Sequence, residues 1–216
     1  MRFKAVIFDL DGTVLNTIDD LSDSANHVLA AHGLPTHTVT AFKKMVGNGI
    51  PKLVRRMLPD DLPDETVENI LTEFRAYYAL HSEDKTAPYP DMQPLLAGLR
   101  AAGLKLCVLS NKQHDIAVKV VTHYFGNAFD HIQGLCEAFP PKPAPDSCRA
   151  LLDTLGMTES DVLYVGDSNV DMQTAANAGL YKCGVSWGFR SVEELKEAGA
   201  DIIADTPEDI LHIALG

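Results

Sequence analysis

Two aspartates stand one residue apart near the start of the chain, directly after an apolar run. Residues 3–8 read FKAVIF, which is typical of a buried strand, and Asp9 and Asp11 follow it. Because residues i and i+2 of a strand point the same way, both carboxylates are expected on one side. Carboxylates this close repel each other unless a cation or a shared proton lies between them. The pair therefore indicates a hard-metal, phosphoryl-transfer site.

Further polar side chains follow other apolar runs. In an open parallel sheet, ligands bind beyond the carboxyl ends of the strands, so residues that directly follow a strand are the site candidates. They are Ser110, Asn111 and Lys112 after residues 105–109, Asp167, Ser168 and Asp171 after residues 162–166, and Lys142 from a proline-rich loop.

The order of the expected elements indicates an α/β fold. Strands are expected at 3–8, 105–110, 131–134, 162–166, 181–185 and 202–204, and helices at 91–102, 116–123, 146–155, 172–178 and 192–197. Strands that alternate with helices of this length form a parallel sheet with helices on both faces. We therefore expect a Rossmann-like core.

Some ninety residues separate the first two strands, whereas an ordinary crossover needs only about a dozen. Helices are expected within this stretch at 17–33, 39–46, 51–57 and 65–81. We assign residues 15–85 to an inserted α-helical cap domain and residues 1–14 and 86–216 to the core. Residues 13–16 and 86–90 would act as hinges when the cap closes.

Four motifs in this order resemble those of the haloacid-dehalogenase superfamily of phosphatases. They are D-x-D-G-T at 9–13, the serine at 110, the loop lysine at 142 and G-D-x-x-x-D at 166–171. The resemblance covers the whole chain, and its order is more specific than a lone D-x-D. It implies that Asp9 attacks phosphorus to form an aspartyl-phosphate and that Asp11 serves as general acid and base.

The resemblance also implies a magnesium ion and a phosphate site. Mg²⁺ would be bound by Asp9, the backbone carbonyl of Asp11, and Asp167. Ser110, Asn111 and Lys142 would hold the phosphoryl oxygens, where negative charge must be neutralised. Thr13, Ser168 and Asp171 would support these groups from behind, and Asp171 could orient Lys142 or a water on the metal.

The expected cap carries a concentration of basic residues. Lys43, Lys44, Lys52, Arg55 and Arg56 lie within residues 41–56, a stretch without an acidic residue. The turn formed by Gly47, Asn48 and Gly49 opens a helix whose free N–H groups could face an anion. We expect this turn, with Lys52 and Arg55, to select a substrate that carries a second negative group such as a carboxylate.

Within the superfamily, the chain most resembles the phosphoglycolate phosphatases. Residues 46–49, 110–112, 164–168 and 187–190 carry this likeness. The alternatives are a pyrophosphatase, a sugar-phosphate or nucleotide phosphatase, and a phosphoglucomutase-like transferase, against which Thr13 argues. A rival G-x-S-x-G motif centred on Ser186 matches the nucleophile motif of other hydrolases, which needs an acid and then a histidine later in the chain. His212 is the only histidine after Ser186.

Charge and composition limit the kinds of molecule that the protein is expected to bind. The net charge of −12 argues against a nucleic-acid surface. No run is long enough for a transmembrane helix, and the N-terminus has no signal-peptide pattern. The four cysteines are widely spaced and expected to be reduced. We expect a cytoplasmic monomer or homodimer that acts on a small anionic phosphomonoester.

Overall fold

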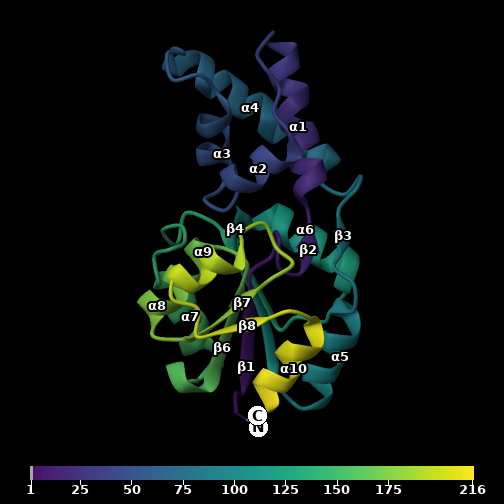
Figure 1. Cartoon of the computed structure of the whole chain (residues 1–216), viewed down its shortest axis with the longest axis vertical. Coiled ribbons are helices and arrows are strands. Elements are labelled where there is room, and N and C mark those ends of the chain that lie inside the picture. The colour runs from purple at the N-terminus through teal and green to yellow at the C-terminus, as the bar shows by residue number, and fades with distance from the viewer. Residues whose placement is uncertain (1) are drawn as a thin grey trace.

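A computed structural model describes residues 2–216 (Figure 1). Its centre is a six-stranded parallel sheet with strand order β5-β4-β1-β6-β7-β8. The strands are β1 (Ala5–Phe8), β4 (Lys105–Gln113), β5 (His131–Leu135), β6 (Val162–Gly166), β7 (Tyr181–Val185) and β8 (Ile202–Ala204). The expected Rossmann-like α/β core is confirmed.

Helices cover both faces of this sheet because β1 is apolar on both sides. Val6 and Phe8 pack in one cluster with three helices, and Ala5 and Ile7 pack in another with two. The first group is α5 (Met92–Ala101), α6 (His114–Phe125) and α10 (Pro207–Leu215), and the second is α7 (Asp146–Leu155) and α8 (Asn169–Ala178). The short helix α9 (Val192–Glu197) lies against β7, and a 3₁₀ turn spans Glu159–Asp161.

The register of the sheet brings three strand ends together. Phe8, the last residue of β1, pairs with Val108 of β4 and Val165 of β6. The residues that follow these three strands therefore meet at one edge of the sheet.

Four helices lie beyond this edge, at the top of Figure 1. They are α1 (Ile18–Ala31), α2 (Val39–Met45), α3 (Ile50–Met57) and α4 (Asp64–His81), and they bury their apolar side chains in a separate cluster. Two short strands, β2 (Leu15–Asn16) and β3 (Ala87–Pro88), pair antiparallel where the chain enters and leaves this cap. The cap boundaries at residues 15 and 85 stay a prediction.

Three features differ from the sequence expectation. Helix α10 was not expected, although Thr206 and Asp209 form a capping box at its start. The β2–β3 ribbon was also not expected. Strand β4 continues to Gln113 instead of ending near Ser110, so Ser110 and Asn111 are strand residues.

Candidate active site

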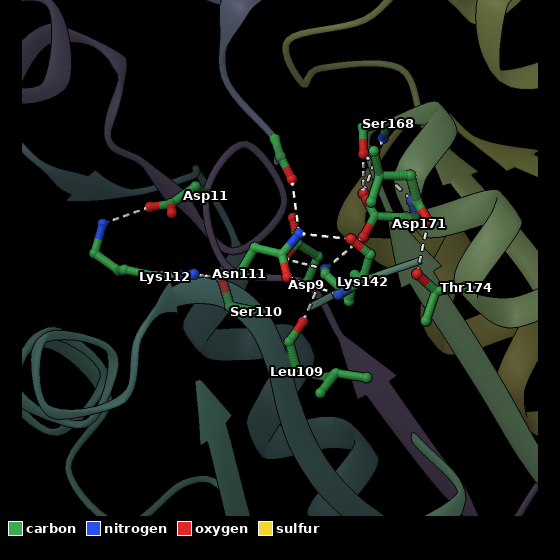
Figure 2. A network of polar contacts seen from close by, with 12 residues as sticks. Asp9, Asp11, Leu109, Ser110, Asn111, Lys112, Lys142, Ser168, Asp171 and Thr174 are labelled. Atoms are coloured by element: carbon green, nitrogen blue, oxygen red, sulfur yellow. Dashed lines mark hydrogen bonds and ion pairs between the residues drawn. The ribbon is translucent and has the colours of Figure 1, made fainter. Parts of the chain in front are cut away.

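Asp9 follows β1 and lies at the centre of a buried polar cluster. Its backbone N–H donates to the carbonyl of Val165, which fixes the residue against β6. Nζ of Lys142 lies 2.8 Å from Oδ1 of Asp9 and 2.7 Å from Oδ1 of Asp171 (Figure 2). The structure thus brings three of the expected site residues, from three separate segments, into direct contact.

The ammonium of Lys142 is fully enclosed by acceptors. Besides the two carboxylates it donates to the carbonyl of Leu109 at 3.0 Å and to the hydroxyl of Tyr164 at 3.2 Å. Burial disfavours its charged form, but attraction to Asp171 and Asp9 outweighs burial and raises its pKa well above the usual value. Lys142 therefore remains a cation that holds Asp9 in place.

Asn111 connects this cluster to the cap. Its Oδ1 accepts the backbone N–H of Lys142 at 2.8 Å, and its Nδ2 donates to the carbonyls of Lys142 and Gly47, each at 3.1 Å. Because protein groups already use both ends of this amide, the side chain positions the Lys142 loop. A contact between Asn111 and phosphate stays a prediction, as does that of Ser110, whose buried hydroxyl accepts the N–H of Lys112.

Three buried carboxylates lie close together around Asp9. One carboxylate oxygen from each of Asp9, Asp167 and Asp171 lies within 4.8 Å of the other two. Burial and repulsion from Asp171 raise the pKa of Asp9 to about 7, even though Lys142 opposes the shift. Burial, with repulsion from Asp171 and Asp9, raises the pKa of Asp167 well above its usual range. One lysine leaves excess negative charge here, so the donor set fits a hard divalent cation.

The hydrogen bonds indicate which carboxylates are free for such a cation. Oδ1 of Asp171 accepts from Lys142, and its Oδ2 accepts the N–H and hydroxyl of Ser168 in a capping box at the start of α8. Both Asp171 oxygens are therefore engaged, and Asp171 orients Lys142. This arrangement leaves Asp9 and Asp167 as the better side-chain ligands.

The loop after β7 packs directly on Asp167. The backbone N–H of Phe189 donates to Oδ2 of Asp167 at 2.7 Å. A Cβ on Gly188 would lie 2.2 Å from Cβ of Asp167, and one on Gly12 would lie 2.2 Å from its Oδ2. The two glycines thus leave the space that this carboxylate occupies. The resemblance of residues 187–190 to the phosphoglycolate phosphatases pointed to this loop. The close contact of Gly188 with Asp167 was not predicted.

Asp11 has a different partner from Asp9. Its Oδ1 lies 2.8 Å from Nζ of Lys112, and this ammonium also donates to the hydroxyl of Tyr78 from cap helix α4. Figure 2 shows the Asp11–Lys112 pair on the other side of Asn111 from the Asp9–Lys142 pair. The sequence placed Lys112 among the polar residues at a strand end but assigned it no role, and it did not predict Tyr78 as a site residue.

A cavity of about 40 Å³ separates the core from the cap beside Asp9 and Asp11. Its lining residues are Asp9, Asp11, Leu21, Val46, Gly47, Gly49, Ile50, Leu53, Tyr78, Ser110, Asn111 and Lys112. Because a water molecule needs roughly 10–15 Å³ on this measure, the space suits a small leaving group.

Only part of the basic cap segment borders this cavity. The glycines of the Gly47–Gly49 turn do, whereas Asn48, Lys52 and Arg55 are not among the lining residues. Lys52 and Arg55 are exposed, and Arg55 donates to the carbonyl of Asp60. The selectivity expected of Asn48, Lys52 and Arg55 stays a prediction.

Two other candidates take structural positions. Thr13 is fully buried; its carbonyl accepts from the indole of Trp187, and among residues 2–216 its hydroxyl has no hydrogen-bond partner. Ser186 follows β7, and its N–H donates to the carbonyl of Ala204. Within the described residues, no hydrogen bond joins Ser186 to a histidine.

No helix in the described range is long and apolar enough to cross a bilayer.

Several known proteins are similar to this chain over nearly its whole length. The phosphoglycolate phosphatase of Rhodospirillum rubrum is 36% identical over 212 residues, which cover 94% of this chain and 87% of the relative. That of Neisseria meningitidis is 31% identical over 95% of this chain and 91% of the relative. A crystal structure from Lactobacillus delbrueckii, provisionally assigned as a phosphoglycolate phosphatase, superposes with a TM-score of 0.95 at 34% identity and covers both chains completely.

The family model for haloacid dehalogenase-like hydrolases matches residues 6–185. This range includes every motif that predicted the family, from Asp9 to Asp171. The chain therefore belongs to the haloacid dehalogenase-like hydrolases and is one of their phosphatases.

Proposed function

We propose that this phosphatase hydrolyses 2-phosphoglycolate, or a phosphomonoester of the same small size, through an aspartyl-phosphate on Asp9. The observation that carries the proposal is the small cavity that borders both Asp9 and Asp11. The names of the relatives agree with such a substrate. A space of this size favours a small leaving group over a nucleoside.

Asp9 acts as the nucleophile. Lys142 binds Oδ1 of Asp9, so Oδ2 is left to attack phosphorus. As the new Asp9–phosphorus bond forms, the bond to the leaving oxygen breaks, and Asp11 donates its proton to that oxygen. Asp11 then takes a proton from water, which attacks phosphorus, releases inorganic phosphate and regenerates Asp9.

We propose Mg²⁺ as the cofactor, held by Asp9, Asp167 and the backbone carbonyl of Asp11. The bound ion would neutralise phosphoryl charge and hold a substrate oxygen. The raised pKa values of Asp9 and Asp167 support a cation here, because two buried carboxylates remain uncompensated without one.

Phosphate release from a panel of phosphomonoesters, with Mg²⁺ and with EDTA, tests the proposal. We expect 2-phosphoglycolate to be the best substrate and EDTA to abolish its turnover. Asp9→Asn should reduce kcat by at least about 10³-fold, since the covalent route is lost. Turnover that prefers a nucleotide or pyrophosphate, or an active Asp9→Asn variant, would contradict it.

The location and assembly expected from the sequence also stay predictions. The four free cysteines, three of them buried in the core, support a reducing, cytoplasmic location. Light scattering of the purified protein would distinguish between the two expected states, a monomer and a homodimer.

A further inference from the structure

Two buried lysines reach the site, and they differ in how many of their donors are used. An ammonium has three N–H donors. Lys142 has four acceptors around it, whereas Lys112 has two within residues 2–216, Asp11 Oδ1 and the Tyr78 hydroxyl. One N–H of Lys112 therefore has no oxygen acceptor there, although its side chain is only 2% exposed.

Tyr78 offers a second unused donor. Its hydroxyl accepts from Lys112, so the phenolic proton is free to be donated, and no described residue accepts it. Burial raises the pKa of Tyr78 to about 12, despite attraction to Lys112, so this proton is retained at neutral pH. The centre of the Tyr78 ring lies 4.8 Å from the ammonium of Lys112. This ring attracts the ammonium less strongly than a bound anion would.

Both donors border the cavity between core and cap. Lys112 and Tyr78 line it together with four apolar side chains, those of Leu21, Val46, Ile50 and Leu53. Among the lining side chains, Lys112 carries the only positive charge, and Asp9, Asp11, Ser110 and Asn111 supply the other polar groups besides Tyr78. A buried ammonium with a free N–H, beside a free hydroxyl donor, can form charge-assisted hydrogen bonds to an anion, and such bonds are stronger than those between neutral groups.

We propose that Lys112 and Tyr78 bind the second negative group of the substrate, a carboxylate on the alcohol side of a short phosphomonoester. This inference rests on the proposed phosphatase function and assigns the selectivity to a core strand and α4. It differs from the sequence expectation, which assigned the same selectivity to the turn at Gly47 with Lys52 and Arg55.

The test compares two substrates of nearly equal size. One is 2-phosphoglycolate, and the other is 2-hydroxyethyl phosphate, in which a hydroxymethyl group replaces the carboxylate. Lys112→Met and Tyr78→Phe are assayed beside Lys105→Met, a control on the opposite end of β4 whose lysine pairs with Asp130 at the surface. Charge-assisted hydrogen bonds of this kind change affinity by roughly tenfold to a hundredfold.

We expect the wild-type enzyme to prefer 2-phosphoglycolate and Lys112→Met to lose this preference by about tenfold or more in kcat/KM. Tyr78→Phe, which removes only a hydroxyl, should lose part of it, and Lys105→Met none. Equal losses on both substrates would show that Lys112 acts only on Asp11 and would overturn the inference. Loss of the preference in Lys52→Ala or Arg55→Ala instead would overturn it as well.

Calorimetry separates this inference from the proposed function. Asp9→Asn protein is titrated with each compound, alone and combined with Lys112→Met. Tighter binding of 2-phosphoglycolate that disappears with Lys112→Met supports the anion site, even if wild-type turnover proves slow. Equal binding of both compounds by Asp9→Asn protein, together with active wild-type enzyme, contradicts the anion site but leaves the phosphatase function intact.

Discussion

The ammonium of Lys142 and the carboxylate of Asp9 lie 2.8 Å apart, although 133 residues separate them in the chain. Asp171 lies 2.7 Å from the same ammonium and receives two hydrogen bonds from Ser168. Asp9, the proposed nucleophile, is therefore held by a cation that Asp171 at the start of α8 orients. Such an arrangement fixes Asp9 before substrate arrives, which is how positioned groups lower a barrier.

Removing this lysine should damage stability and activity together. Lys142→Met leaves the buried carboxylates of Asp9 and Asp171 without their partner, and breaking a buried pair this way costs about 3–5 kcal/mol. Urea unfolding of the variant measures this cost. The double variant Lys142→Met with Asp171→Asn should recover part of the stability without recovering turnover. Recovery of both would show that Lys142 has no function beyond charge balance.

Stability should depend on pH and Mg²⁺ together. The pKa of Asp9 is raised to about 7, from 3.8, so the unfolded chain releases this proton at lower pH than the folded chain. Metal-free protein therefore loses stability as pH rises from about 4 through about 7. Mg²⁺ should raise Tm more at about pH 7.5 than at about pH 5.5, and Asp9→Asn should reduce this difference. A shift that is independent of pH would contradict the metal assignment.

The sequence predicted the parts of the site that depend on strand ends. Asp9 and Asp167 follow runs so apolar that their strands could be placed, and parallel strands necessarily bring their carboxyl ends to one edge. Lys142 was placed by motif order and its proline-rich setting. These inferences need only local patterns and one rule about sheets.

The rest of the site depends on how the cap sits on the core. The contact between Lys112 and Tyr78 joins two elements whose relative position no local pattern specifies. The same holds for Arg190, whose guanidinium donates to the backbone carbonyls of Lys43, Lys44 and Val46 in the cap. Helix α10 is a different case, because its capping box at Thr206 was a readable signal.

Gly188 gives a test of the metal site that removes no charged group. A Cβ at this position would lie 2.2 Å from Asp167, so Gly188→Ala must displace that carboxylate. We expect the Mg²⁺ concentration for half-maximal activity to rise at least about tenfold. In the control Gly98→Ala, the added Cβ meets only Leu211 methyl groups at 3.3 Å and 3.4 Å. Unchanged Mg²⁺ dependence in Gly188→Ala would argue against Asp167 as a ligand.

The carboxylate of Asp20 links the two segments through which the chain enters and leaves the cap. This carboxylate on α1 is 2% exposed, and it accepts the backbone N–H groups of Lys85 and Thr86, each at 2.8 Å. It lies next to the β2–β3 ribbon. It therefore holds residues 85 and 86, where the chain leaves the cap, against α1. Asp20→Ala leaves two backbone donors unsatisfied and should cost about 2–4 kcal/mol of unfolding free energy.

Asp23 on the same helix provides the matched control for Asp20. It pairs with Nζ of Lys85, but both side chains are more than half exposed, at 56% and 59%. Asp23→Ala should therefore cost less than about 1 kcal/mol. Limited proteolysis should cut Asp20→Ala faster than wild type near residues 82–88, with Asp23→Ala unchanged. Equal effects of the two substitutions in urea unfolding and proteolysis would mean that the buried carboxylate does not fix the connector.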